Sequence, residues 1–122
     1  MHLISGAAQR RKLAVQCRYR SADPYAVELD FGADEGGAVW VLSRELLRLG
    51  LRGPAGDGDV HIEPGDGDMV FIALGGRVGI ALLNAPADPL ARFLAATEDL
   101  VPTGRESSHL DWERCITALL AT

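Results

Sequence analysis

Short segments that alternate apolar with polar residues, separated by turns rich in glycine and aspartate, restrict the fold of this chain most. Tyr25, Val27, Leu29 and Phe31 alternate with residues that are small or charged. A period of two is typical of a half-buried β-strand, because successive side chains of a strand point to opposite faces of the sheet. The chain is therefore expected to build antiparallel sheets from short strands.

Six segments have the length and composition of such strands, namely residues 13–20, 25–31, 38–42, 60–63, 69–74 and 77–83. The first three are expected to form one antiparallel sheet. Residues 38–42 are apolar on both faces, which favours a central or covered strand. The segments 34–37 and 65–68 and the pair Gly75-Gly76 predict tight turns, and residues 53–58 predict a loop.

A short helix is predicted over residues 44–49. Ser43 is expected to be its N-cap, and Glu45 lies in the first turn, where a negative charge complements the helix dipole. Gly50 is expected to end the helix in the left-handed conformation that glycine adopts readily.

Two further helices are predicted near the C-terminal end. The first begins with Asp88 as its cap and Pro89 at its first position, and its apolar stripe consists of Leu90, Phe93, Leu94, Thr97 and Val101. The second runs from Trp112 to Ala121 behind Asp111, with Trp112, Cys115, Ile116 and Leu119 as its buried stripe. Strands combined with helices at the ends of the sheets indicate an α+β fold and not a doubly wound parallel one.

Length and composition indicate one domain that spans residues 1–122. A chain of 122 residues with 48% hydrophobic content can form one buried core. Its apolar runs are far shorter than the roughly 20 residues of a membrane-spanning helix, and the apolar and charged residues at the start have the wrong order for a secretory signal. Cys17 and Cys115 give no disulfide signal and are expected to be buried free thiols. A cytoplasmic location is the prediction.

The net charge of -5 combines a basic N-terminal segment with an acidic remainder. Five of the 12 basic residues lie within residues 10–20, and all 17 acidic residues follow them. An acidic chain repels phosphate backbones, so nucleic acid is not expected as a partner. The basic segment (Arg10, Arg11, Lys12, Arg18 and Arg20) is interpreted as a solvated strand edge, with a contact to an acidic protein partner as the alternative.

Sequence motifs for catalysis or phosphate binding are missing. The glycines do not have the spacing of a G-x-S-x-G elbow, a P-loop or a G-x-G-x-x-G loop. His2, His61 and His109 stand too far apart in the sequence to suggest a zinc site. The acidic residues between Asp57 and Asp68 are interrupted by apolar ones, so we interpret them as turn chemistry and not as a calcium loop. No enzyme, metal or cofactor is expected.

Two histidines leave an unrecognised hydrolase as an alternative. His109 follows Ser107 and Ser108, but neighbours in a loop seldom have the geometry of a nucleophile and its base. His61 alternates with apolar residues on a predicted strand and is expected to face solvent. The tryptophans Trp40 and Trp112 are interpreted as core or oligomer-interface residues and not as ligand platforms.

An ordered set of segments points to a known family. It comprises YRSADPYAV (19–27), VWVLSRELL (39–47), GLRGPAGDGDV (50–60), LNAP (83–86), Phe93-Leu94, Val101-Pro102 and Leu110-Asp111-Trp112. This set, over residues 13–122, resembles the SsgA/SsgB-like sporulation and cell-division proteins of actinomycetes. Members of that family have a longer alternating strand where this chain has residues 1–9, so the first strand is expected to be shortened or partly missing.

The resemblance implies a Whirly-like fold of two antiparallel β-sheets with helices, assembled as a homotrimer through its helical side. It also implies a non-catalytic adaptor that helps to localise the division GTPase FtsZ to future septum sites during sporulation-specific division. FtsZ and sister SsgA-like proteins are the implied partners, together with membrane-associated division proteins, and direct membrane insertion is not expected. Paralogues influence septal peptidoglycan synthesis and spore separation instead.

Arg44, Glu45 and Arg48 are the candidate partner-binding residues, because exposed short helices beside loops often carry recognition. A simple solvated helix face is the alternative interpretation of these charges. The implied fold also leaves single-stranded nucleic-acid binding as an alternative function. The composition opposes it, since aromatic residues are 6% of the chain and the net charge is negative, whereas such binders combine a basic groove with stacking rings.

Overall fold

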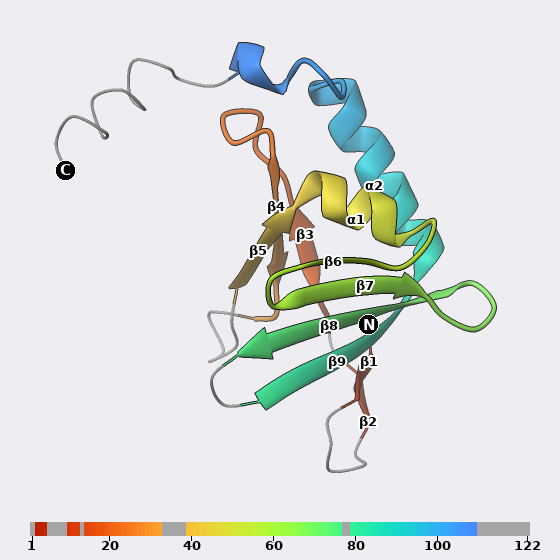
Figure 1. Cartoon of the computed structure of the whole chain (residues 1–122). Coiled ribbons are helices and arrows are strands. Elements are labelled where there is room, and N and C mark those ends of the chain that lie inside the picture. Colours follow the sequence, from red (N-terminus) through yellow and green to blue (C-terminus); the bar gives the residue numbers. More distant parts are fainter. Residues whose placement is uncertain (1, 5–9, 13, 33–38, 77–78, 110–122) are drawn as a thin grey trace, which may run out of the picture.

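A computed structural model describes residues 2–4, 10–12, 14–32, 39–76 and 79–109 (Figure 1). This part of the chain has the predicted α+β fold, with two antiparallel sheets and two α-helices. The strands are β1 (His2–Ile4), β2 (Arg10–Lys12), β3 (Gln16–Arg18), β4 (Ala26–Asp30), β5 (Val39–Ser43), β6 (Ala55–Asp57), β7 (Val60–Pro64), β8 (Met69–Gly76) and β9 (Gly79–Pro86). The helices are α1 (Arg44–Gly50), α2 (Ala87–Leu100) and the 3₁₀ turn η2 (Glu106–His109).

The smaller sheet has the order β3-β4-β5 and forms from the first predicted strand group. Val27 and Leu29 of β4 are fully buried, as their alternation predicts. The expectation of a central or covered β5 is wrong for the described residues, because β5 lies at one edge of this sheet and Val39 and Val41 are 41% and 58% exposed. An apolar sequence on both faces predicts a strand but does not say which neighbour covers it.

The larger sheet has six strands in the order β2-β1-β9-β8-β7-β6. Its longest pairing joins β8 to β9, from Met69 opposite Pro86 to Gly76 opposite Gly79. The predicted turn at Gly75-Gly76 is therefore wrong, because both glycines are paired residues of β8 and the connection is 77–78. The 65–68 turn lies where predicted, with Gly67 at a φ of 60°.

Three strands lie outside the six predicted segments, and one of them, β1, lies within residues 1–9, where the resemblance implied a shortened first strand. β6 occupies part of the expected loop 53–58 and pairs with β7, with Gly56 opposite His61. β1 and β2 pair with each other, and β1 also pairs with β9. The predicted strand over residues 13–20 is reduced to β3, and the predicted turn at 34–37 and helix at 112–121 lie outside the described residues.

α1 packs closely against β7, and Gly50 makes this possible. A Cβ atom on Gly50 would lie 2.3 Å from Ile62 Cγ2 and 2.4 Å from Ile62 Cβ. Gly50 is the last helical residue, and the cap that follows it, Leu51, has right-handed φ and ψ of -75° and -18°. The expectation of a left-handed stop at Gly50 is therefore wrong: glycine is needed here for close approach and not for its backbone freedom.

α2 carries the predicted apolar stripe but begins two residues earlier than predicted. Its N-cap is Pro86, so Asp88 is in the first turn and is not the cap. Leu90, Leu94, Thr97 and Val101 are buried, and Phe93 packs against the core. The buried cluster joins both sheets and both helices and consists of Val27, Leu29, Leu42, Leu46, Leu47, Ile62, Val70, Ile72, Leu74, Leu83, Ala85, Leu90 and Leu94.

Candidate functional site

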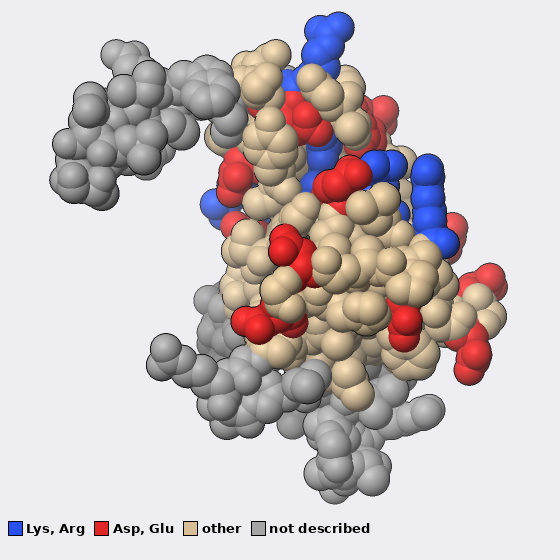
Figure 2. All heavy atoms as spheres, in the orientation of Figure 1, with Lys and Arg blue, Asp and Glu red and all other residues tan. Residues whose placement is uncertain are grey.

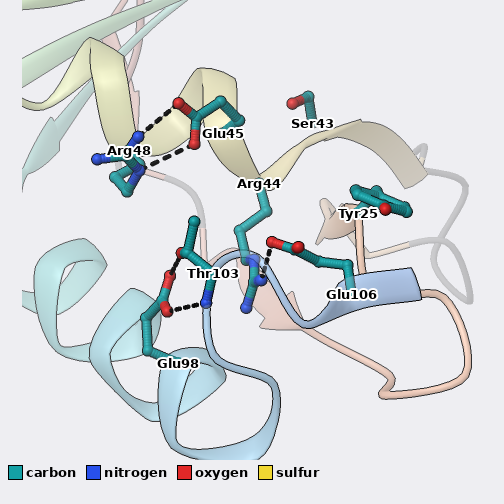
Figure 3. Close-up of a pocket in the computed structure, with 8 residues that line it drawn as sticks. All are labelled: Tyr25, Ser43, Arg44, Glu45, Arg48, Glu98, Thr103 and Glu106. Atoms are coloured by element: carbon teal, nitrogen blue, oxygen red, sulfur yellow. Dashed lines mark hydrogen bonds and ion pairs between the residues drawn. The ribbon is translucent and has the colours of Figure 1, made fainter. Parts of the chain in front are cut away.

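The three candidate residues Arg44, Glu45 and Arg48 lie around one small hollow between α1 and the end of α2 (Figure 3). The hollow is lined by Tyr25, Ser43, Arg44, Glu45, Arg48, Glu98, Thr103 and Glu106, and its volume is about 40 Å³. Such a volume holds a few water molecules, whereas sites for metabolites are typically about 300–1,000 Å³. The site is therefore a shallow feature of the surface rather than a substrate pocket.

Ser43 positions the start of α1, as predicted. Its backbone is extended, and its hydroxyl oxygen accepts a hydrogen bond from the Leu46 N–H at 3.1 Å. This bond satisfies one of the N–H groups that have no partner within the first turn of a helix. Because β5 runs directly into this cap, the side chains of α1 are held at a fixed place beside the smaller sheet.

Arg44 is buried and joins α1 to the end of α2. Its side chain is 4% exposed, so the expectation that Arg44 is an exposed contact residue is wrong. The guanidinium donates hydrogen bonds to the carbonyl oxygens of Thr97 at 3.3 Å and Val101 at 2.7 Å. These carbonyls belong to the last turn of α2 and to the residue that caps its C-terminal end, where a positive charge is favoured by the helix dipole. Arg44 is thus a structural residue of this site.

A carboxylate and an aromatic ring complete the surroundings of Arg44. The guanidinium donates to Glu106 Oε1 at 2.8 Å, and its carbon lies 5.2 Å from the centre of the Tyr19 ring, within the range of a cation–π contact. Hydrogen bonding by its own backbone N–H, and then by Arg44 and the Gly104 N–H, holds the pKa of Glu106 below its usual value. Burial raises the pKa of Tyr19, whose hydroxyl donates to the Pro24 carbonyl at 2.9 Å.

Glu45 and Arg48 pair with each other on the outward side of α1. Arg48 Nε donates to Glu45 Oε2 at 2.9 Å, and the side chains are 32% exposed for Arg48 and 53% exposed for Glu45. An exposed pair three residues apart on a helix stabilises it by about 0.2–0.5 kcal/mol. Both groups are accessible, so they can exchange this pairing for one with a partner at little cost.

Glu98 closes the other side of the hollow. Its carboxylate accepts hydrogen bonds from the Thr103 N–H at 2.7 Å and from the Thr103 hydroxyl. These bonds, the hydroxyl first, hold the pKa of Glu98 below its usual value. Glu98 thereby fixes the turn that leads from α2 into η2, and with it the position of Glu106.

The other residues whose side chains could act as acids, bases, nucleophiles or metal ligands do not lie at this site. His61 is solvent-facing, as predicted, with its Nε2 3.5 Å from Glu63 Oε2, and Ser107 and Ser108 are exposed on η2. Within the described ranges, no three residues of the types His, Cys, Asp and Glu are grouped so as to hold a metal ion. Cys17 is half-buried, and burial raises the pKa of its thiol; the side chains of His109 and Cys115 lie outside the description.

Two surface properties bear on the choice of partner. On the face shown in Figure 2, basic side chains gather toward the end of the molecule where α1 and α2 lie, and acidic ones dominate over β6–β8. The described residues of this face form no continuous basic groove, which single-stranded nucleic-acid binders require. Of the helices that the structure describes, none is both long enough and apolar enough to cross a membrane.

Sequence reasoning found Ser43, Glu45 and Arg48 but missed the residues that hold Arg44. Tyr19, Thr97, Val101 and Glu106 are 25 to 62 positions away from Arg44 in the sequence, and no local pattern links them. The resemblance covered all four positions but assigned none of them a role. An arginine at the first position of a short helix, where a negative charge is usual, was the available signal.

Comparison with a library of protein families matches residues 13–106 to the family described as Streptomyces sporulation and cell division protein, SsgA. Sporulation-specific cell division protein SsgB of Streptomyces coelicolor is 46% identical, over 99% of this chain and 91% of its own length. The SsgB protein of Salinispora tropica is 40% identical, over 99% of this chain and 89% of its own length.

Two solved structures share the fold. One comes from work on SsgB mutations that correlate with longitudinal cell division during sporulation of Streptomyces coelicolor; it has a TM-score of 0.81 and 39% identity and covers 88% of each chain. The other is an SsgA-like sporulation-specific cell division protein from Thermobifida fusca, with a TM-score of 0.81 and 38% identity over 96% of this chain and 88% of that one.

Proposed function

This chain belongs to the SsgA family of sporulation and cell division proteins, and we propose that it is a non-catalytic adaptor of sporulation-specific division. In this role it helps to recruit or position the division GTPase FtsZ at septum sites through protein–protein contacts. The family match over residues 13–106, which includes the whole of α1 and most of the site around it, carries the proposal.

The chemistry of the site supports a binding role. Each charged group around the hollow is already engaged: Arg44 with Glu106, Arg48 with Glu45, and Glu98 with Thr103. A catalytic acid or base would need a proton-transfer partner on a substrate, and a hollow of about 40 Å³ has no room for one. These paired groups instead fix the shape of the surface around the hollow.

The outward side of α1 is the proposed contact surface. Glu45, Arg48 and Leu49 lie on it, and Leu49 is 45% exposed although it is apolar. An apolar side chain beside an exposed ion pair gives both the buried area and the orientation that a weak protein contact needs. We expect Glu45 and Arg48, but not the buried Arg44, to contact the partner.

Co-sedimentation with GTP-assembled FtsZ from the same organism tests this proposal. The wild-type protein should pellet in a saturable manner, and Arg48→Glu should weaken the binding about 5-fold or more, because it places two like charges next to each other on the contact surface. Arg92→Glu is the matched control, since Arg92 forms a similar exposed pair with Asp88 on α2. The control should pellet like the wild type.

The possible outcomes distinguish an error in the proposed contact surface from an error in the proposed function. Equal loss with both variants would refute α1 as the contact surface, and no pelleting of the wild-type protein would refute direct recruitment of FtsZ. Light scattering on the same samples counts subunits, for which we propose a homotrimer. A trimer that does not pellet would indicate a sister SsgA-like protein as the direct partner, and co-sedimentation with that protein added checks this.

A further inference from the structure

The outward face of the larger sheet carries large apolar side chains. Ile72 and Leu83 are buried in the core, so the residues that alternate with them along β8 and β9 point outward. On this face Phe71 is 37% exposed and Leu82 is 41% exposed. Ala73 lies opposite Leu82, so the two large side chains are diagonal neighbours on adjacent strands. The outer strip is the name used below for Met69, Phe71, Ala73 and Leu82.

Phe71 is held in place by the backbone beneath it. A Cβ atom on Gly65 would lie 2.9 Å from both Cδ2 and Cε2 of Phe71, so the ring packs directly on this glycine. Gly65 is fixed in turn, because its N–H donates to the Met69 carbonyl at 2.8 Å. A ring that is already ordered loses little conformational entropy when a partner covers it, which is what an anchor of a binding surface needs.

Acidic residues lie at both ends of the outer strip. At one end, the Met69 N–H donates to the Asp66 carbonyl at 3.2 Å, and Asp68 directly precedes Met69. At the other end, the Gly75 N–H donates to the Asp59 carbonyl at 2.7 Å. All three aspartates are exposed. Met69 and Gly75 are about 20 Å apart along an extended strand, so the two acidic ends are separated by about that distance.

The chain supplies no nearby basic residue in sequence to balance these acids. Residues 53–76 contain five acidic residues and no lysine or arginine. Among the described residues, the one ion pair of this stretch joins Glu63, which lies opposite Phe71, to His61 at 3.5 Å. Figure 2 shows the resulting surplus of acidic side chains over β6–β8. The apolar strip therefore lies in a negative field.

Charge decides between the possible occupants of this face. An acidic surface repels nucleic acid and anionic lipid, and it would also repel the same face of a second copy. A basic partner is attracted, and apolar side chains on it can bury the outer strip. A helix of 14 residues is about 21 Å long, which matches the separation of the acidic ends.

We propose that the outer strip binds a basic amphipathic helix of a partner protein. Its apolar face would lie on Phe71 and Leu82, and its basic residues would lie near Asp59 at one end and Asp66 at the other. This is recognition by the apolar stripe of a helix, with charge fixing the partner's position.

The outer strip is separate from the contact surface proposed on α1. α1 packs against the inward side of the larger sheet, where Gly50 meets Ile62, and the outer strip lies on the opposite side of the same sheet. The proposal therefore does not depend on the adaptor function and is tested without FtsZ.

Fluorescence anisotropy with a designed peptide tests the apolar contact. The probe is a fluorescein-labelled peptide of 14 residues, with leucine on one helical face and lysine on the other. The wild-type protein should bind it saturably, and Phe71→Ala should weaken the binding at least about fivefold. Val41→Ala is the matched control, because Val41 is 58% exposed but lies on β5 of the smaller sheet, and it should bind like the wild type.

Neutralising acidic residues tests the charged contact. Asp66→Asn combined with Asp68→Asn should weaken binding and reduce its dependence on salt, and asparagine is also favoured in turns, so the fold should be kept. Asp88→Asn combined with Asp99→Asn removes the same charge from exposed positions of α2 and should have a smaller effect. A peptide with glutamate in place of lysine should not bind.

Amide chemical shifts of the labelled protein locate the bound lysine peptide. The largest changes should fall on residues 61–73 and 82–86 and not on α1. Four results would overturn the proposal: no binding of the lysine peptide, equal binding of the glutamate peptide, equal binding by the Phe71→Ala and Val41→Ala proteins, or shift changes centred on α1. Light scattering adds a fifth, because an oligomer that dissociates with Phe71→Ala would assign the outer strip to a second copy.

Discussion

The inward and outward faces of α1 differ in what their side chains do, although both faces belong to a helix of seven residues. On the inward face, Arg44, Leu47 and Gly50 contact α2, the core and β7. On the outward face, Glu45 and Arg48 pair with each other, and Leu49 is exposed to solvent. The helix is therefore held by one face and is free to vary on the other, which is the arrangement that a contact surface needs.

Substituting a leucine on each face of α1 gives the largest predicted difference in the free energy of unfolding. Leu47 is fully buried and Leu49 is 45% exposed. Leu47→Ala should lower the free energy of unfolding by about 2–5 kcal/mol because it leaves a cavity, and Leu49→Ala should lower it by less than about 1 kcal/mol. Urea denaturation followed by circular dichroism measures both, and equal losses would contradict the contrast between the faces.

Substituting an arginine on each face of α1 gives the next largest difference in the free energy of unfolding. Arg44→Met removes the partner of Glu106 and of the last carbonyls of α2, and should cost about 2–3 kcal/mol of unfolding free energy. Arg48→Met removes an exposed pair and should cost less than about 0.5 kcal/mol. The same denaturation experiment applies, and a stable Arg44→Met variant would show that its hydrogen bonds contribute little.

A glycine inside α1 and one after it are expected to differ in the stability that is lost when each is replaced by alanine. Gly50→Ala places a methyl group against Ile62 and should cost about 1–3 kcal/mol. Gly53→Ala is the control, because a Cβ there meets nothing within 4 Å, and its effect should be within about 0.5 kcal/mol. Thermal unfolding of both variants would detect the difference, and a tolerated Gly50→Ala would mean that β7 moves away easily.

The smallest effect is a dependence of stability on acid pH. The pKa of Glu106 is lower in the folded state than its ordinary value of 4.5, so its contribution to stability is complete above that value and is lost as the pH falls through the folded pKa. Glu106→Gln should therefore destabilise the protein at neutral pH and have less effect once the pH falls below that ordinary value. Asp88→Asn, at an exposed position of α2, is the control for loss of a charge.

Features set by neighbouring residues could be predicted from the sequence. The cap at Ser43, the alternation in β4 and the stripe of α2 each depend on residues a few positions apart, and each is confirmed. The start of α2 was predicted late because Asp88 is a common cap, whereas Pro86 takes that position without a side-chain hydrogen bond. Local preference decides such details only when tertiary contacts do not.

Features set by distant residues could not be predicted. β6 contains Gly56 and reads as a loop, and it is a strand because β7 pairs with it. The burial of Arg44 depends on Thr97, Val101 and Glu106, which lie 53 to 62 positions away. The sequence placed Arg44 correctly on a helix but could not indicate which face of that helix meets another part of the chain.

The hydrogen bonds of Arg44 also have a consequence for motion. Because one side chain is fixed to the first turn of α1, the last turn of α2 and η2, none of these segments can open without releasing the other two. Their backbone amides should exchange with solvent deuterium as a single cooperative unit. The beginning of one helix and the end of another, separated by most of the larger sheet in the sequence, would then share one rate of opening.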